Sequence, residues 1–276
     1  PLSHNIFTAL YRPRNPMKDI QSQPDSRRIN IKKVGVKDIS YPITVLDKAK
    51  TVQRTVARVN MYVNLPHQFK GTHMSRFVEI LNQFHGNINL QSFHSILDAM
   101  KKRLQAEEAH MEIEFPFFLK RTDCSPAMSG ISEYSCRMHG SLDKVDDLIL
   151  TVEVPISAPS AVQSNEGLPK SLGRWGMAEV SLRLSHFIWI EDLISMVENV
   201  TCHDRSWHDE MDDDDREDSL SVEDMTKRLS EKIASHPNIN WFSVTVENFS
   251  KNYSTFATLE WPESGETHRH WPTEQQ

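Results

Sequence analysis

The sequence predicts a protein of the α+β class, in which an antiparallel sheet packs against paired helices. Two observations predict this class. Segments in which apolar and polar residues alternate, as in strands, occur in pairs along the chain. Between one such pair and the next lie two segments with apolar residues at helical spacing. Strands grouped around paired helices favour an antiparallel sheet over a βαβ fold. The chain also has only nine glycines and contains neither GxGxxG nor GxxxxGK, so no glycine-rich phosphate loop is expected.

The first part of the chain is expected to have the order strand, strand, helix, helix, strand, strand. The expected segments are, in order, residues 29–45, 51–63, 74–84, 92–108, 109–120 and 133–142. The first strand has an irregular middle, and residues 51–63 form its hairpin partner. In that partner we expect Val56, Val59, Met61 and Val63 to share a face.

The same order is expected a second time. The segments are residues 148–154, 177–185, 188–200, 221–235, 241–248 and 254–261. Ser221 is a plausible cap for the fourth helix, because a serine side chain accepts a hydrogen bond from a free N–H group of the first turn. The two parts share an order of elements without a shared residue pattern.

These elements predict two halves flanked by irregular ends. Residues 1–27 lack periodicity and are expected to form a flexible arm, and residues 263–276 a disordered polar tail. Residues 28–145 then form the first half and residues 146–262 the second.

Charge is distributed unevenly along the chain. The net charge of −7 combines +8 over residues 1–120 with −15 over residues 121–276. An acidic chain without basic blocks is a poor candidate for binding bulk nucleic acid, although a basic pocket for a small polyanion stays open. Three cysteines without CxxC spacing indicate a reducing compartment, and no apolar run approaches the ~20 residues of a membrane span, so we expect a cytoplasmic protein without a membrane partner.

The most informative segment is a polar loop between an expected strand and an expected helix. Within ten residues it holds five side chains that suit an anion: His67, Lys70, Thr72, His73 and Arg76. A helix N-terminus offers free N–H groups and a positive dipole end, and the neighbouring cations add charge-assisted hydrogen bonds to a phosphate. The alternative is an ordinary loop in which Thr72 or His73 caps the helix and Arg76 pairs with a surface carboxylate.

Two acidic features lie in the second part of the chain. Glu223 begins a helix, where it either complements the helix dipole or accepts two N–H bonds from a guanine or pterin edge. Residues 209–218 hold eight acids in ten positions and are either a solvated loop or a weak divalent-cation site. Isolated histidines such as His94, His110 and His236 are expected to be packing or surface residues.

Several segments together resemble the prokaryotic type IB GTP cyclohydrolase I family. The stretch VARVNMYVNLPHQFKGTHMSRFVEIL carries the resemblance most specifically, and LTVEVPI, FIWIEDLI, SVEDM and WFSVTVENF follow in the expected order. The resemblance implies tandem tunnelling-fold halves, each β-β-α-α-β-β, assembled as a homotetramer with active sites between subunits. It also implies conversion of GTP and water to formate and 7,8-dihydroneopterin triphosphate, with a water activated by Zn²⁺ or Mn²⁺ attacking C8 of the purine.

The resemblance transfers to this chain residue by residue. The family's guanine-binding glutamate matches Glu223. Its basic loop matches the segment with His67, Lys70, Thr72, His73 and Arg76, and Arg174 also resembles a residue of the family. The metal and catalytic positions depart from the family. Where the family has a Cys-Pro-Cys-Ser segment, this chain has a segment that ends in Ser160. Where the family has a catalytic histidine, this chain has Tyr253. Substitute metal ligands would be His208 and Glu210, beside and within the acidic segment.

Two functions follow from these departures. In the first, the chain is a divergent GTP cyclohydrolase with substitute metal ligands. In the second, it is a catalytically inactive paralogue that binds a purine or pterin nucleotide or serves as an oligomer partner. A serine hydroxyl is a poor metal ligand at neutral pH, so the sequence is compatible with both the enzyme and the inactive paralogue.

Overall fold

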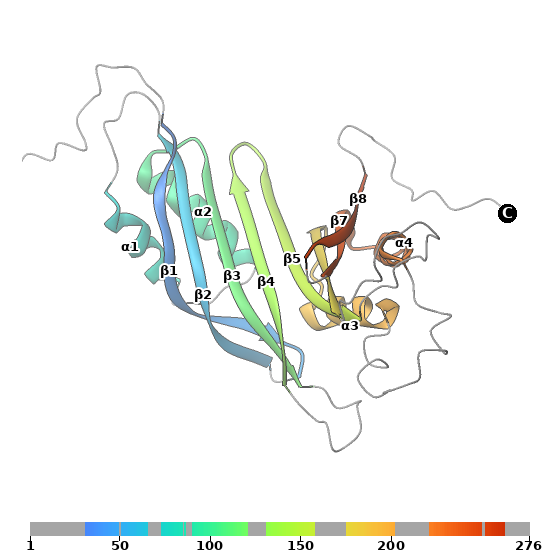
Figure 1. The fold of residues 1–276 in the computed structure, drawn as a ribbon. Coiled ribbons are helices and arrows are strands. Elements are labelled where there is room, and N and C mark those ends of the chain that lie inside the picture. Colours follow the sequence, from blue (N-terminus) through green and yellow to red (C-terminus); the bar gives the residue numbers. More distant parts are fainter. Residues whose placement is uncertain are drawn as a thin grey trace, which may run out of the picture.

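One antiparallel sheet runs through the whole of the described chain (Figure 1). The computed structural model describes residues 31–49, 51–65, 73–84, 86, 90–120, 131–157, 175–201, 221–249 and 252–262. Its strands lie in chain order, so each pairs with the next. They are β1 (Ile31–Asp47), β2 (Thr51–Leu65), β3 (Ala109–Lys120), β4 (Ile131–Leu142), β5 (Asp146–Ser157), β6 (Trp175–Leu184), β7 (Ile239–Phe249) and β8 (Ser254–Trp261).

Helices cover one face of this sheet. They are α1 (Ser75–Gln83), α2 (Leu90–Leu104), α3 (Ile190–Thr201) and α4 (Val222–Ala234). Helix α2 packs on β2, β3 and β4, whereas α3 packs on β5 and α4 on β7 and β8. The order β-β-α-α-β-β therefore occurs twice among the described residues, and the expected α+β class with an antiparallel sheet is confirmed. None of the helices in this part of the chain is long and apolar enough to cross a membrane.

Strand β1 has the irregular middle that its sequence predicts. Its pairing with β2 shifts register between Ile31 and Val34 and again between Val36 and Ile39. At the second shift Asp38 has a φ of 57°, and its N–H donates to Oδ1 of Asn60 at 2.9 Å. A side chain of β2 therefore stabilises the bulge by binding the backbone group that the ladder leaves over.

The expected face of β2 is partly wrong. Ala57, Val59, Met61 and Val63 are buried, whereas Val56 is 59% exposed. Side chains alternate between the two faces of a strand, so residues 56 and 59, which differ by an odd number, lie on opposite faces. Only the odd-numbered positions of β2 reach the core.

Helix α2 is shorter than expected. It ends at Leu104, whereas the sequence predicts a helix to residue 108. Gln105 takes a left-handed conformation with φ 53°, and the N–H of Ala106 donates to the carbonyl of Lys101 at 3.0 Å. This 6→1 hydrogen bond around a left-handed residue is a Schellman-type ending, which here forms without a glycine.

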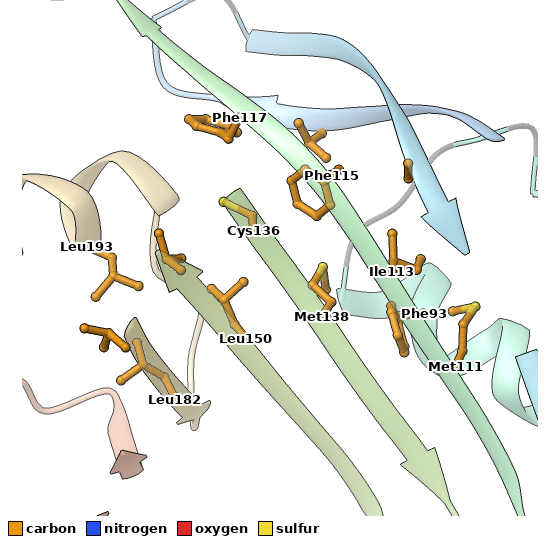
Figure 2. Close-up of a cluster of buried hydrophobic side chains, with 14 of the residues drawn as sticks. Phe93, Met111, Ile113, Phe115, Phe117, Cys136, Met138, Leu150, Leu182 and Leu193 are labelled. Carbon is orange, nitrogen blue, oxygen red and sulfur yellow. The ribbon is translucent and has the colours of Figure 1, made fainter. Parts of the chain in front are cut away.

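The hydrophobic core is continuous between the two parts of the chain (Figure 2). Side chains of all four helices and of the helix-covered face of the sheet form it, and Figure 2 shows the part between α2 and α3. The labelled members are Phe93, Met111, Ile113, Phe115, Phe117, Cys136, Met138, Leu150, Leu182 and Leu193. Because β4 and β5 contribute neighbouring members of one core, the two β-β-α-α-β-β parts do not have separate interiors.

Polar contacts join the same two parts. In the β1–β2 turn, Lys48 binds Asp192 through Nζ at 2.6 Å and Glu191 through its backbone N–H at 2.7 Å. The hydroxyl of Tyr134 on β4 donates to Oε1 of Glu198 at 2.6 Å. These contacts attach α3 to the β1–β2 turn and to β4, through residues more than sixty positions apart in the sequence.

One glycine sets the closest approach between helix and sheet. A Cβ placed on Gly140 in β4 would lie 2.3 Å from Cε1 and 2.9 Å from Cδ1 of Phe93 in α2. Phe93 is 1% exposed, so an added methyl group at residue 140 would have to displace a buried ring. A glycine in the interior of this strand is therefore explained by packing.

We predict that Gly140→Ala lowers the free energy of unfolding by about 1–3 kcal/mol, because the added methyl group overpacks the core against Phe93. Urea denaturation measures the loss. Adding Phe93→Leu should return part of the stability lost through Gly140→Ala, since the two sites are in contact and do not behave additively. Strict additivity of the two substitutions would contradict this packing account.

Candidate functional site

The first turn of α4 is fixed by its capping residues. Ser221 has an extended backbone (φ −68°, ψ 163°), and its Oγ accepts a hydrogen bond from the N–H of Asp224 at 3.1 Å. The same Oγ donates to Oδ2 of Asp224 at 2.9 Å. Ser221 therefore caps the helix through its side chain, which confirms its expected role.

Two acids lie in that turn, and the structure separates their roles. Asp224 is bound to Ser221 and already complements the helix dipole. Glu223 is exposed, and no described residue forms a hydrogen bond or an ion pair with its carboxylate. The helix end therefore does not need Glu223 for capping, and no described residue occupies its two carboxylate oxygens.

The turn is held against the last strand of the sheet. Thr226, which is 3% exposed, donates through Oγ1 to the carbonyl of Val222 at 2.7 Å and to that of Ala257 on β8 at 3.4 Å. A short connection joins the end of α4 to the start of β7, so the first turn of α4 lies toward the β7–β8 connection. Glu223 thus stands beside the terminal strand of the sheet.

The strand register brings other sequence-predicted positions to the same end. Ser157 pairs with Trp175, and the next residue of β6, Gly176, pairs with Asn248 near the end of β7. Tyr253, between β7 and β8, is 43% exposed at this end. Ser160 and Arg174 lie outside the described residues, but the described neighbours on either side of 158–174 are anchored here.

The start of α1 is electrostatically unusual. Met74 occupies the N-cap position without a side-chain hydrogen bond, and the first turn contains no acid. Arg76 is exposed in that turn, and none of the described carboxylates pairs with it. The expected surface ion pair of Arg76 is therefore absent among the described residues. A cation at a helix N-terminus is unfavourable unless an anion is bound nearby. His67, Lys70 and Thr72 lie outside the described residues.

One chain does not bring the starts of α1 and α4 together. Helix α1 lies against β1, where the hydroxyl of Tyr41 donates to the carbonyl of Leu81 at 3.3 Å. Helix α4 lies against β7 and β8. Because β1 and β8 are the first and last strands of the sheet, the two helix starts are at opposite ends of the molecule (Figure 1).

The described donors do not form a thiolate–imidazole metal site. In the described part of the chain, no group of three or more His, Cys, Asp or Glu side chains could hold a metal ion. Burial, followed by the charges of Glu153 and Glu191, raises the pKa of the Cys136 thiol, so this thiol stays protonated and is a poor ligand. The expected substitute ligands, His208 and Glu210, lie outside the described residues.

A polar network that the sequence did not predict lies on the face of the sheet without helices. Glu112 on β3 accepts hydrogen bonds from Nδ2 of Asn60 and the hydroxyl of Tyr62, both at 3.0 Å. His110 stacks on Tyr62 with ring centroids 4.9 Å apart, and His139 stacks on His110 at 6.3 Å. Because Asn60 also binds the bulge of β1, this network joins four adjacent strands.

The pKa values of this network follow from its contacts. Burial raises the pKa of Glu112, but the hydrogen bonds from Asn60 and Tyr62 outweigh burial and leave it below the usual value. Burial and the Glu112 carboxylate raise the pKa of Tyr62 to about 12. Burial lowers the pKa of His139, so this ring is neutral at neutral pH.

Solved structures share this fold at very low sequence identity. Urate oxidase from Bacillus sp. TB-90 matches with a TM-score of 0.55 and 8% identity, over 83% of this chain and 99% of that chain. A uricase from Bacillus fastidious matches with a TM-score of 0.54 and 8% identity, over 83% and 92% of the two chains. The fold therefore belongs to the class of α+β proteins whose helices cover one face of a long antiparallel sheet.

Sequence comparison shows the family. Residues 17–251 match the family model described as "Type I GTP cyclohydrolase folE2". GTP cyclohydrolase FolE2 of Syntrophobacter fumaroxidans is 43% identical over 88% of this chain and 99% of its own length. GTP cyclohydrolase FolE2 of Geobacter metallireducens is 45% identical over 88% and 97% of the two chains. The chain belongs to the FolE2 family of type I GTP cyclohydrolases, and the expected membership of the GTP cyclohydrolase I family is confirmed.

We predict that Glu112→Gln weakens the protein most at neutral pH. A carboxylate whose folded pKa is depressed contributes stability above its usual pKa of 4.5, and that stability is lost as the pH falls through the lower folded pKa. The loss at about pH 7 should be about 1 kcal/mol, because the site is partly exposed to solvent.

Urea denaturation of both proteins between about pH 7 and about pH 3 measures this effect, and the difference should shrink toward the acid end. Glu114→Gln is the matched control, since Glu114 is on the same strand face and makes only an exposed contact of 3.9 Å with Arg58. A pH-independent difference for Glu112→Gln would contradict the network described here.

Proposed function

We propose that this protein is a GTP cyclohydrolase I-type enzyme that converts GTP and water to formate and 7,8-dihydroneopterin triphosphate. The observation that carries the proposal is the Glu223 carboxylate, which no described residue binds, at the end of the sheet where Tyr253 and the neighbours of residues 158–174 also lie. Family membership supports the reaction and the place of the chain in pterin or folate biosynthesis. We propose further that the protein is cytoplasmic and that it is a GTP cyclohydrolase I of type IB.

Glu223 would anchor the purine. A carboxylate has two acceptor oxygens, and the guanine edge offers two adjacent N–H donors, at N1 and at the 2-amino group. Because Asp224 already serves the helix end, binding of guanine by Glu223 costs the helix no capping interaction. This geometry would discriminate guanine from adenine, which lacks both donors at these positions.

The basic loop would bind the triphosphate. Arg76 and His73 stand at the uncapped start of α1, and Lys70, His67 and Thr72 precede them in sequence. An anion there receives charge-assisted hydrogen bonds and relieves the unfavourable position of Arg76. Arg174 is a further cation for this role.

Both ends of the nucleotide require two chains. Since α1 and α4 lie at opposite ends of one sheet, Glu223 and Arg76 meet only if the β1 edge of one copy approaches the β8 edge of another. This requirement supports a homo-oligomer, and the family resemblance suggests a tetramer of tandem tunnelling-fold halves. The unpaired outer edges of β1 and β8 provide backbone groups for such a contact.

Ser160 and Tyr253 would stand at the reacting end of the purine. The phenol of Tyr253 donates and accepts hydrogen bonds, but unlike an imidazole it does not exchange protons readily near neutral pH. Zn²⁺ or Mn²⁺, which the resemblance implies, would supply an activated water, with His208 and Glu210 as proposed ligands in this chain. Hydroxyl side chains at the two family positions suit that metal poorly.

The same departures favour a second function, a nucleotide-binding paralogue without turnover. In this reading Glu223 and the basic loop bind GTP or a pterin, and Ser160 and Tyr253 no longer support ring opening. The two functions share a binding site and differ only in product formation, so binding and turnover are tested separately.

Glu223→Gln should weaken GTP binding by roughly 10- to 100-fold, because one charged acceptor is lost and the amide presents a donor to the guanine N–H groups. Isothermal titration calorimetry measures the affinity. Glu231→Gln is the matched control, since Glu231 is an exposed acid of the same helix, and it should leave the affinity unchanged. Equal affinities for wild type and Glu223→Gln would rule out the anchor.

Turnover should appear as neopterin fluorescence after oxidation of a reaction of the protein with GTP and either Mn²⁺ or Zn²⁺. The wild-type protein should form the product with at least one of the two ions, and Glu223→Gln should form markedly less. If GTP binds but no product forms with either ion, the paralogue reading replaces the enzyme reading.

A further inference from the structure

We infer that Ser221, Asp224 and Thr226 are positioning residues for Glu223, so that the specificity for guanine depends on hydrogen bonds that never touch the nucleotide. The inference deepens the proposed function and rests on the role of Glu223 as purine anchor. It concerns three polar side chains in one turn of α4.

The first step is that this turn depends on side chains for its shape. The first N–H groups of a helix lack partners within the helix and need other acceptors. Here the N–H of Asp224 is bound by Oγ of Ser221 at 3.1 Å, and the reciprocal bond from Oγ to Oδ2 of Asp224 is 2.9 Å. Ser221 is 8% exposed, so solvent does not readily replace its hydroxyl.

The second step is that Thr226 fixes the turn relative to the sheet. Its Oγ1 contacts the carbonyl of Val222 within the turn at 2.7 Å and that of Ala257 in β8 at 3.4 Å. Val222 and Met225, at 8% and 4% exposed, pack toward the core on the same side. The backbone of Glu223 is therefore held from both sides in sequence and across to the terminal strand.

The third step is that Glu223 itself contributes nothing to this arrangement. No described residue binds its carboxylate, and its side chain is exposed. A long, unrestrained side chain can present two oxygens to a planar edge only if its backbone is fixed, because binding otherwise costs side-chain and backbone ordering. Asp224 and Ser221 fix the backbone of Glu223 without binding its carboxylate.

The experiment compares affinities for GTP and inosine triphosphate, which lacks the 2-amino group. Ser221→Ala should lower the affinity for GTP by roughly 3- to 10-fold, and the preference for GTP over inosine triphosphate should fall as well. Asp224→Ala, which keeps the N–H bond to Ser221 and removes only the reciprocal bond, should have a smaller effect of the same kind. Ser221→Thr, which keeps the hydroxyl, should restore wild-type preference.

Ser235→Ala is the matched control. Ser235 lies at the other end of α4, where its exposed Oγ donates to the carbonyl of Lys232 at 2.6 Å. Its removal weakens the same helix without reaching Glu223, so both affinities should stay at wild-type values. Folding of each variant is verified by circular dichroism and by titration at a temperature well below the unfolding midpoint.

The double variant Ser221→Ala/Glu223→Gln gives the decisive comparison. If Ser221 acts through Glu223, the double variant binds GTP no more weakly than Glu223→Gln alone. Full additivity of the two losses, or an unchanged nucleotide preference in Ser221→Ala and Asp224→Ala, would overturn the inference while leaving the anchor intact. An unchanged affinity in Glu223→Gln itself would overturn both the anchor and the inference.

Discussion

The structure depends on one constraint, the alternation of side chains along a continuous antiparallel sheet that helices cover on one face only. Every second residue of β2 to β7 must enter a dry core, and polar groups shielded from water on the opposite face must be paired. Ala57, Ile113 and Val152 obey the first requirement, and the Glu112 network obeys the second. Among the described strands, β1 and β8 each pair with a neighbour on one edge only.

This register also determines where chemistry can occur. Because β5, β6 and β7 are paired residue by residue, Ser157 and Trp175 are fixed next to the end of β7. The N-terminal turn of α4 then places Asp224, which binds Ser221, and Glu223, which no described residue binds, at the same end. Strand pairing and helix capping together position these residues, and in the proposed function a second copy would supply the basic loop.

Most elements were predictable from sequence because their apolar periodicity was strong, as in β3 and β8, whose bounds agree with the expected segments. The cap at Ser221 was predictable because its residue type and position follow one local rule. The left-handed ending at Gln105 was not, since no glycine marks it. The Glu112 network was also missed, because it joins residues of four strands; the alternation of His110, Glu112 and Glu114 on one face of β3 was the available signal.

The central claim is that Glu223 reads the guanine edge while an adjoining copy holds the triphosphate. Family membership supports the GTP cyclohydrolase reaction for this chain. Ser160 and Tyr253, which replace a cysteine and a histidine of the family, raise the question of how the chain would bind a metal and transfer protons. A crystal structure with a GTP analogue bound tests the claim most directly. We predict N1 and the 2-amino group of guanine on the Glu223 carboxylate, with the triphosphate at the start of α1 in a neighbouring copy. A guanine bound away from Glu223, or a nucleotide enclosed by one chain, would contradict it.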